Sequence, residues 1–263
     1  MIFLPIVALA LLGSVFALIG GVVFLLIPSW SKWLMKVSVP FAAGVLLTVA
    51  MVGLIPEALE LYGENALLIV LGSFLSAYLF EHLFFSLHHH DEEHHHHIVK
   101  SIPLIVVGDT IHNFVDGVAI AASYLINPGL GVVTAVSTFL HEVPHEIGDF
   151  GILLKAGWSN KKVMVTNLCS ALATLIGVFF VILFPQTEAF LGGLIALAAG
   201  LFLYLGATDF LPHLEHEEGS WTNIVALLAG VLIMLGTLYA VPHDHPEAED
   251  HATEISGHVS PID

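Results

Sequence analysis

The sequence predicts an all-α, polytopic membrane protein with eight transmembrane helices. Its residues are 57% hydrophobic and only 11% charged, and its mean hydropathy is +0.90, whereas about a quarter of the residues in a soluble domain are charged. A bilayer core of about 30 Å is crossed by about 20 apolar residues of helix. Eight stretches are long enough: 2–27, 37–61, 65–87, 103–126, 129–156, 163–184, 189–211 and 221–241. They are too long for the strands of a membrane barrel, and a helix leaves no backbone group unpaired in lipid.

Turn-forming residues separate these helices in order along the chain. They are Pro28-Ser29, Gly63-Glu64-Asn65, Asn127-Pro128-Gly129, Gly157 to Asn160, Pro185-Gln186 and Glu217-Glu218-Gly219. The chain starts apolar at once, without a basic leader, so we expect a first membrane span rather than a cleaved signal peptide. We therefore expect one eight-helix domain over 1–242, with a His-rich loop at 88–97, followed by an acidic, disordered tail at 243–263.

The lysines predict the orientation in the membrane. The chain has no arginine, and all its lysines lie in or beside the connections that follow the odd-numbered helices. They are Lys32, Lys36, Lys100, Lys155, Lys161 and Lys162. Because an excess of lysine marks the cytoplasmic side, we expect these connections inside the cell and both termini outside.

Two distant helices resemble one another. The stretch 42–60 aligns with 198–216 at a constant offset, and each has Ala-Ala-Gly followed twelve residues after the glycine by a proline, Pro56 or Pro212. The two helices are expected to run in opposite directions, which is typical of the inverted repeats of secondary transporters. The pattern predicts a 3+2+3 arrangement, with helices 103–126 and 129–156 as the central pair. The alternative is convergence of two helix ends.

Metal-ligand side chains gather in that central pair. Ionisable groups inside a bilayer cost about 2.5–3.5 kcal/mol each, so they usually serve a function. Side chains four residues apart share a helix face, which groups His112 with Asp116 and His141 with His145. A set of nitrogen and oxygen ligands without thiolate suits Zn, Fe(II), Mn or Co. The candidates are Asp109, His112, Asn113 and Asp116 on the first helix and His141, Glu142, His145, Glu146 and Asp149 on the second.

These motifs resemble those of ZIP (Zrt/Irt-like protein) metal transporters. HNFVDG at 112–117 is similar to the family's fourth-helix motif, and HEVPHEIGD at 141–149 matches the subfamily whose fifth helix reads HExPHExGD. The stretches 148–157 and 199–214 also resemble sequences of that subfamily. The resemblance implies transport of divalent ions toward the cytoplasm, zinc most often, with iron, manganese and cadmium as other substrates. It also implies an integral protein of a prokaryotic plasma (inner) membrane and allows a homodimer.

The resemblance also assigns ligands by position. One ion would use His112, Asp116, His141, Glu142 and His145, and a second would share Asp116, Glu142 and His145 and add Asn113. Helix 163–184 lacks the glutamate that some bacterial relatives supply there, which puts the second ion in doubt, although Asn167 could contribute weakly. Accessory residues are expected among Asp109, Glu146, Asp149, Asn167, Asp209 and His213.

The segment 88–97 reads HHHDEEHHHH and predicts weak, fast-exchanging metal binding on the cytoplasmic side. A metal-receiving or sensing loop and a plain solvated spacer are both consistent with it. The imidazoles are those of His88, His89, His90, His94, His95, His96 and His97.

Other functions remain open from the residues alone. HEVPH at 141–145 formally fits the HExxH motif of a zinc protease, with Glu142 as general base, but Pro144 lies inside it and no third ligand is evident. A proton-linked carrier of an organic solute could also use such groups. The net charge of −17 argues against a nucleic-acid partner, and the single Cys169 excludes an internal disulfide.

Overall fold

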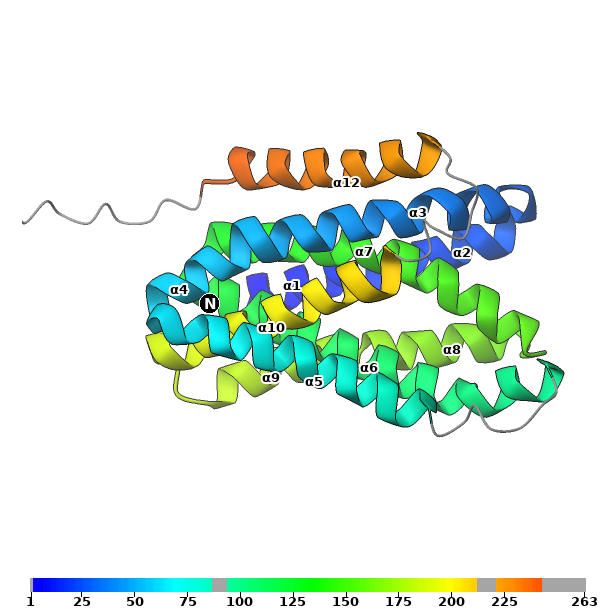
Figure 1. Cartoon of the computed structure of the whole chain (residues 1–263), viewed down its shortest axis with the longest axis horizontal. Coiled ribbons are helices and arrows are strands. Elements are labelled where there is room, and N and C mark those ends of the chain that lie inside the picture. Colours follow the sequence, from blue (N-terminus) through cyan, green and yellow to red (C-terminus); the bar gives the residue numbers. More distant parts are fainter. Residues whose placement is uncertain (1, 87–93, 212–220, 243–263) are drawn as a thin grey trace, which may run out of the picture.

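The computed structural model describes residues 2–86, 94–211 and 221–242, and these residues form helices without any strand. The helices lie roughly side by side along the long axis of the molecule (Figure 1). Three expectations fall outside the described residues: the first half of the His-rich segment, His213, and the tail from 243 on. The side chain of Asp209 is not described either.

The first third of the chain makes three long apolar runs. The elements are α1 (Phe3–Gly13), η1 (Val15–Leu18), α2 (Ile19–Leu26), α3 (Pro28–Thr48), η2 (Val49–Leu54), α4 (Ile55–Tyr62), η3 (Gly63–Asn65) and α5 (Ala66–Ser86). The second run starts at Pro28, nine residues earlier than expected, because proline is well suited to the first turn of a helix. The chain reverses between α4 and α5 at Gly63, whose φ of 68° only glycine adopts readily.

The centre of the chain is the hairpin of α6 (His94–Ile126) and α7 (Pro128–Lys155). Asn127 separates the two helices, and its side chain accepts hydrogen bonds from the backbone N–H groups of Gly129 (2.7 Å) and Leu130 (3.3 Å). This cap lets α7 start with only Asn127 between it and the end of α6. Because α6 begins at His94, the second half of the segment expected as a loop is helical instead.

The last third contains α8 (Asn160–Ala171), α9 (Ala173–Leu183), α10 (Glu188–Tyr204), η4 (Leu205–Phe210) and α12 (Trp221–Ala240). Ser159 and Thr187 cap the starts of α8 and α10 through their hydroxyl oxygens. α12 lies along α3 at one edge of the bundle (Figure 1), and α10 packs against α5. α6 packs against α7 and α9, which places the central hairpin inside the bundle.

Six segments among the described residues are long and apolar enough to cross a membrane. They are Phe3–Leu26, Lys36–Leu83, Ile102–Ile126, Asn160–Leu183, Glu188–Thr208 and Trp221–Ala240. Lys36–Leu83 contains the reversal at Gly63, and α7 is absent from the six. The chain is therefore a polytopic, all-helical membrane protein in the part that the structure describes.

Two short π-helical segments interrupt the helices that resemble one another in sequence. η2 follows α3 and η4 follows α10, and both occupy the same place in the alignment of 42–60 with 198–216. In η2 the backbone N–H of Ile55 donates to the carbonyl of Ala50, and at the end of η4 that of Leu211 donates to Gly206, both five residues back. A proline follows each segment two residues later. Because proline lacks an N–H and clashes with the preceding turn, a widened turn accommodates it.

Candidate metal centre

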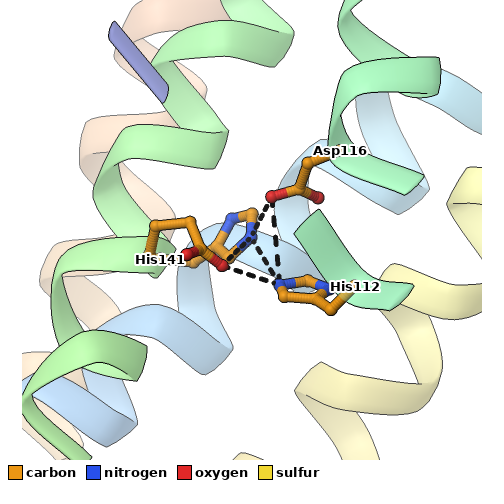
Figure 2. A group of neighbouring side chains, drawn as sticks. His112, Asp116 and His141 are labelled. Carbon is orange, nitrogen blue, oxygen red and sulfur yellow. Dashed lines mark hydrogen bonds and ion pairs between the residues drawn. The ribbon is translucent and has the colours of Figure 1, made fainter. Parts of the chain in front are cut away.

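The hairpin brings four ligand side chains to one point between α6 and α7. His112 Nε2 lies 3.0 Å from Glu142 Oε1, and His141 Nε2 lies 3.3 Å from Asp116 Oδ2. The two Nε2 atoms are 3.2 Å apart. Figure 2 shows these contacts converging on one small volume between the helices. All four side chains are buried, and their ligand atoms lie within 4.8 Å of one another.

The charges of this first group are not satisfied by hydrogen bonds. Within the described residues, neither carboxylate oxygen of Asp116 nor of Glu142 has a hydrogen-bond partner, although both residues are fully buried. Buried carboxylates normally have such partners, because an unpaired charge loses its hydration without compensation. Two carboxylates and two imidazole nitrogens around one point are a favourable environment for a divalent cation.

A backbone contact fixes the ring of His141 for ligation. Its Nδ1 lies 2.8 Å from the carbonyl oxygen of Ser137, one turn earlier on α7. A carbonyl only accepts hydrogen bonds, so Nδ1 carries the proton of the neutral ring and Nε2 keeps its lone pair toward Asp116 and His112. This orientation is typical of metal-binding histidines.

A second group lies one turn along the hairpin. Asp109, Glu142 and His145 also have ligand atoms within 4.8 Å of one another, with His145 Nδ1 3.6 Å from Asp109 Oδ1. Glu142 belongs to both groups. His145, expected beside His141 around the first ion, lies in this second group instead.

Asn113 belongs to neither group. Its amide nitrogen donates to Asp109 Oδ1 (3.0 Å), and its amide oxygen accepts a hydrogen bond from Thr174 Oγ1 of α9 (3.2 Å). The expected ligand oxygen is therefore engaged by Thr174, and the side chain orients Asp109. Ser170 of α8 also hydrogen-bonds to the Asp109 carboxylate.

Aromatic rings of α10 and η4 close one side of the centre. Phe202 is fully buried and turns toward His141 and His112, with ring centroids 5.5 and 6.5 Å away. Phe210 lies edge-on to His145 at 6.3 Å. Neither phenylalanine, nor Thr174 or Ser170, was expected at the centre from the sequence. The one available signal was the repeat at 198–216, which contains the two rings.

The remaining expected site residues lie around this centre. Glu146, Asp149 and Asn167 are buried near it, on α7 and α8. His94, His95, His96 and His97 form the start of α6, with side chains outside the described set, and His88, His89 and His90 lie outside the described residues altogether.

Comparison with known proteins agrees with this geometry. A family model described as ZIP Zinc transporter matches residues 90–237, which is more than half of the chain. Zinc transporter foi of Drosophila melanogaster is 42% identical over 111 residues, which cover 42% of this chain and 16% of that protein. Zinc transporter ZIP10 of Danio rerio is 43% identical over 114 residues, covering 43% of this chain and 14% of that protein.

Zinc transporter ZIP4 of Mus musculus is 41% identical over 109 residues, which cover 41% of this chain and 16% of that protein. The match thus spans about a sixth of the length of such relatives. Both metal-ligand groups lie inside the region matched by the family model. The chain belongs to the ZIP zinc transporter family.

Proposed function

We propose that this protein is a transporter that moves divalent transition-metal ions, zinc above all, toward the cytoplasm through the centre between α6 and α7. The observation that carries the proposal is the first group: four buried ligand atoms from two helices, within 4.8 Å of one another. Iron, manganese and cadmium fit the same nitrogen and oxygen ligands. The curated relatives bear the name zinc transporter.

His112, Asp116, His141 and Glu142 hold one ion in this proposal. They offer the four ligands that zinc prefers in a tetrahedral site. A second ion uses Asp109, Glu142 and His145 and shares Glu142 with the first. This second set differs from the one expected by resemblance, since Asp109 takes the place of Asp116 and Asn113.

We further propose that the chain crosses the membrane eight times. Lys36–Leu83 supplies two of the spans, because Gly63 reverses the chain within it. α7 supplies the one remaining span, which is the fifth along the chain. It is not among the six candidate segments because its proposed metal ligands lower its hydropathy. The distribution of lysines supports an orientation with both termini outside. The prokaryotic plasma membrane stays a prediction, since the relatives named above are animal proteins, and so does a homodimer.

The inverted repeat is supported by matching helix contacts. A Cβ added to Gly44 of α3 would collide with the carbonyl of Leu227 on α12, and one added to Gly200 of α10 would collide with the carbonyl of Val70 on α5. Gly44 and Gly200 are the equivalent glycines of the two Ala-Ala-Gly motifs.

The central hairpin fits the same symmetry. The backbone carbonyl two residues after His112 lies against Gly177 of α9, and the carbonyl two residues after His141 lies against Gly20 of α2. Together with the paired π segments, these contacts support the 3+2+3 arrangement.

The alternative of an intramembrane protease has no support. Members of the ZIP family are transporters, so HEVPH is not evidence for peptide hydrolysis here. The partners of His141 and Glu142 on α6, His112 and Asp116, also give Glu142 a role as ligand rather than general base.

Zinc uptake by the purified full chain in liposomes tests the proposal. His112→Ala combined with His141→Ala removes both nitrogen ligands of the first group and should reduce uptake to that of empty liposomes. Glu188→Gln, at the exposed start of α10, is the matched control and should transport like the native protein. Native-level uptake by the double variant would overturn the assignment.

A further inference from the structure

Charged side chains continue beyond the two metal-ligand groups in one direction only. Beyond the second group, toward the end of α7, follow Glu146 and Asp149, while Asp109 of the second group lies on the same side, toward the start of α6. In the other direction the same helices present only uncharged side chains, all fully buried. These are Ile120 and Ser123 on α6 and Thr134, Ser137 and Thr138 on α7. The charged side is the end of the hairpin that carries Lys100 and Lys155.

His145 connects the second group to this charged end. Its Nδ1 lies 3.6 Å from Asp109 Oδ1 and 4.0 Å from Asp149 Oδ2. Glu146 follows Glu142 by one turn on α7, and its carboxylate interacts electrostatically with those of Asp109 and Asp149. An imidazole nitrogen thus lies among three carboxylates, separate from the pair of histidines in the first group.

Two buried side chains at this end, among the described residues, have polar atoms without a hydrogen-bond partner. Within the described residues, Glu146 Oε2 and both amide atoms of Asn167 have no hydrogen-bond partner, although each residue is only 1% exposed. Asn167 lies on α8 three residues before Ser170, whose hydroxyl is 3.1 Å from that of Thr110 on α6. Residues three apart share a helix face, so Asn167 faces α6 one turn beyond Ser170. Buried polar groups of this kind call for a ligand or ordered water.

We propose that Asp109, His145, Glu146, Asp149 and Asn167 form a further divalent-cation station, the release cup, which shares Asp109 and His145 with the second group and lies between the first group and the cytoplasmic end of the hairpin. It rests on the proposed function and adds to it the route by which the ion leaves. An ion held by Asp109, Glu142 and His145 enters the cup by exchanging Glu142 for Asp149, while Asp109 and His145 stay in contact with it. Asp149 is the member of the cup nearest the end of α7, and its side chain keeps some exposure there.

The ligand chemistry predicts weaker binding there than in the first group. The cup offers mainly carboxylate and amide oxygens and one imidazole, so it should hold zinc or cadmium less tightly than a site with two imidazoles. Fast exchange is the property that a release station needs.

Removing the acids of the cup tests the proposal. Glu146→Gln combined with Asp149→Asn should weaken a second, low-affinity class of Cd²⁺ binding by about 10-fold or more, measured by calorimetry on the full chain in lipid nanodiscs. The high-affinity class should be unchanged, and the maximal rate of zinc uptake should fall severalfold at an unaltered KM. Glu188→Gln removes the same kind of carboxylate elsewhere and should change neither property.

Asn167→Asp tests the same cup in the opposite sense. An added carboxylate should raise the affinity of the low-affinity class of Cd²⁺ binding and lower the maximal rate of zinc uptake. If the double variant does not fold, this variant alone tests the release cup. Unchanged low-affinity binding and unchanged uptake in Asn167→Asp would overturn the release cup.

The failure of the proposed function has a different signature. His112→Ala combined with His141→Ala should abolish the high-affinity class and uptake but keep the low-affinity class. Retention of uptake in that variant refutes the central site, whereas loss of both binding classes together refutes a separate cup.

Discussion

Glu142 is the residue on which both metal-ligand groups depend. It approaches His112 at 3.0 Å and also completes the group of Asp109 and His145. Asp116, by contrast, belongs to the first group alone. The two carboxylates are equally buried. Variants that remove one or the other can therefore be compared directly, because the two residues differ mainly in whether they belong to one metal-ligand group or to both.

Glu142→Gln should therefore weaken the binding of both ions, whereas Asp116→Asn should weaken one. Removing a direct metal ligand should lower the metal affinity at least as much as removing a residue that only hydrogen-bonds to a ligand. We therefore expect a loss of affinity of about 100-fold or more. Metal content of the purified variants after dialysis against a fixed free zinc concentration checks this. Equal metal loss in the two variants would show that Glu142 is not shared.

At the same scale, the sequence predicted which residues gather but not how they divide. HNFVDG and HEVPHEIGD indicated the ligand types and the two helices. The division depends on how α6 and α7 are rotated against each other, and this rotation places His145 with Asp109 rather than beside His141. Asn113 is a similar case, because its hydrogen bond from Thr174 comes from a helix some 60 residues away in sequence.

The elements position the centre through close helix contacts. α6 meets α9 where a Cβ on Gly117 would collide with the carbonyl of Thr174. Gly117 directly follows Asp116, so the distance between α6 and α9 also determines where that ligand lies. Small residues at helix crossings are the usual basis of such packing in membranes.

Gly117→Ala should therefore push α6 away from α9 and destabilise the protein by about 1–3 kcal/mol, which is typical of overpacking. Gly108→Ala, on the same helix, is the control, because a Cβ there meets nothing within 4 Å. Thermal unfolding in detergent should show a lower midpoint for Gly117→Ala only. An equal fall of the midpoint in Gly108→Ala would show that the loss of stability does not come from the contact between α6 and α9.

The all-helical, membrane-spanning character of the chain followed from the sequence, since long apolar runs indicate spans. The details that escaped are those without a residue signature. The π turns of η2 and η4 arise from backbone hydrogen bonds five residues apart, and the prolines after them indicated only that the helices are disturbed. The early start of α3 at Pro28 was missed because polar residues follow it and interrupt the apolar run.

For the whole molecule, the proposed metal binding should be linked to folding. An ion that binds only the folded state stabilises it by about 2.7 kcal/mol when free zinc exceeds its Kd 100-fold. The midpoint of thermal unfolding should therefore rise with zinc concentration in the native protein. In the His112→Ala and His141→Ala double variant, which retains only the weaker ligands, the same rise should need a much higher zinc concentration.

The same shift should shrink as the pH falls from about 7.5 to 5.5, because protons compete with the metal for imidazole and carboxylate. Acid thus removes the zinc-dependent part of the stability and leaves the metal-free part. A zinc-dependent shift of constant size across this range would argue against histidine ligation.

α7 carries a consequence for biogenesis. It contains so many ionisable side chains that it is not among the six segments that could cross a membrane by length and composition, so an insertion machinery sorting helices one at a time would favour leaving it in water. The tight turn at Asn127 holds α6 beside α7, so that α6 can bury the ionisable side chains of α7 as the two helices enter the bilayer together. Newly made chains should therefore integrate these two helices as a hairpin, and a longer linker between them should yield misinserted protein even with every ligand intact.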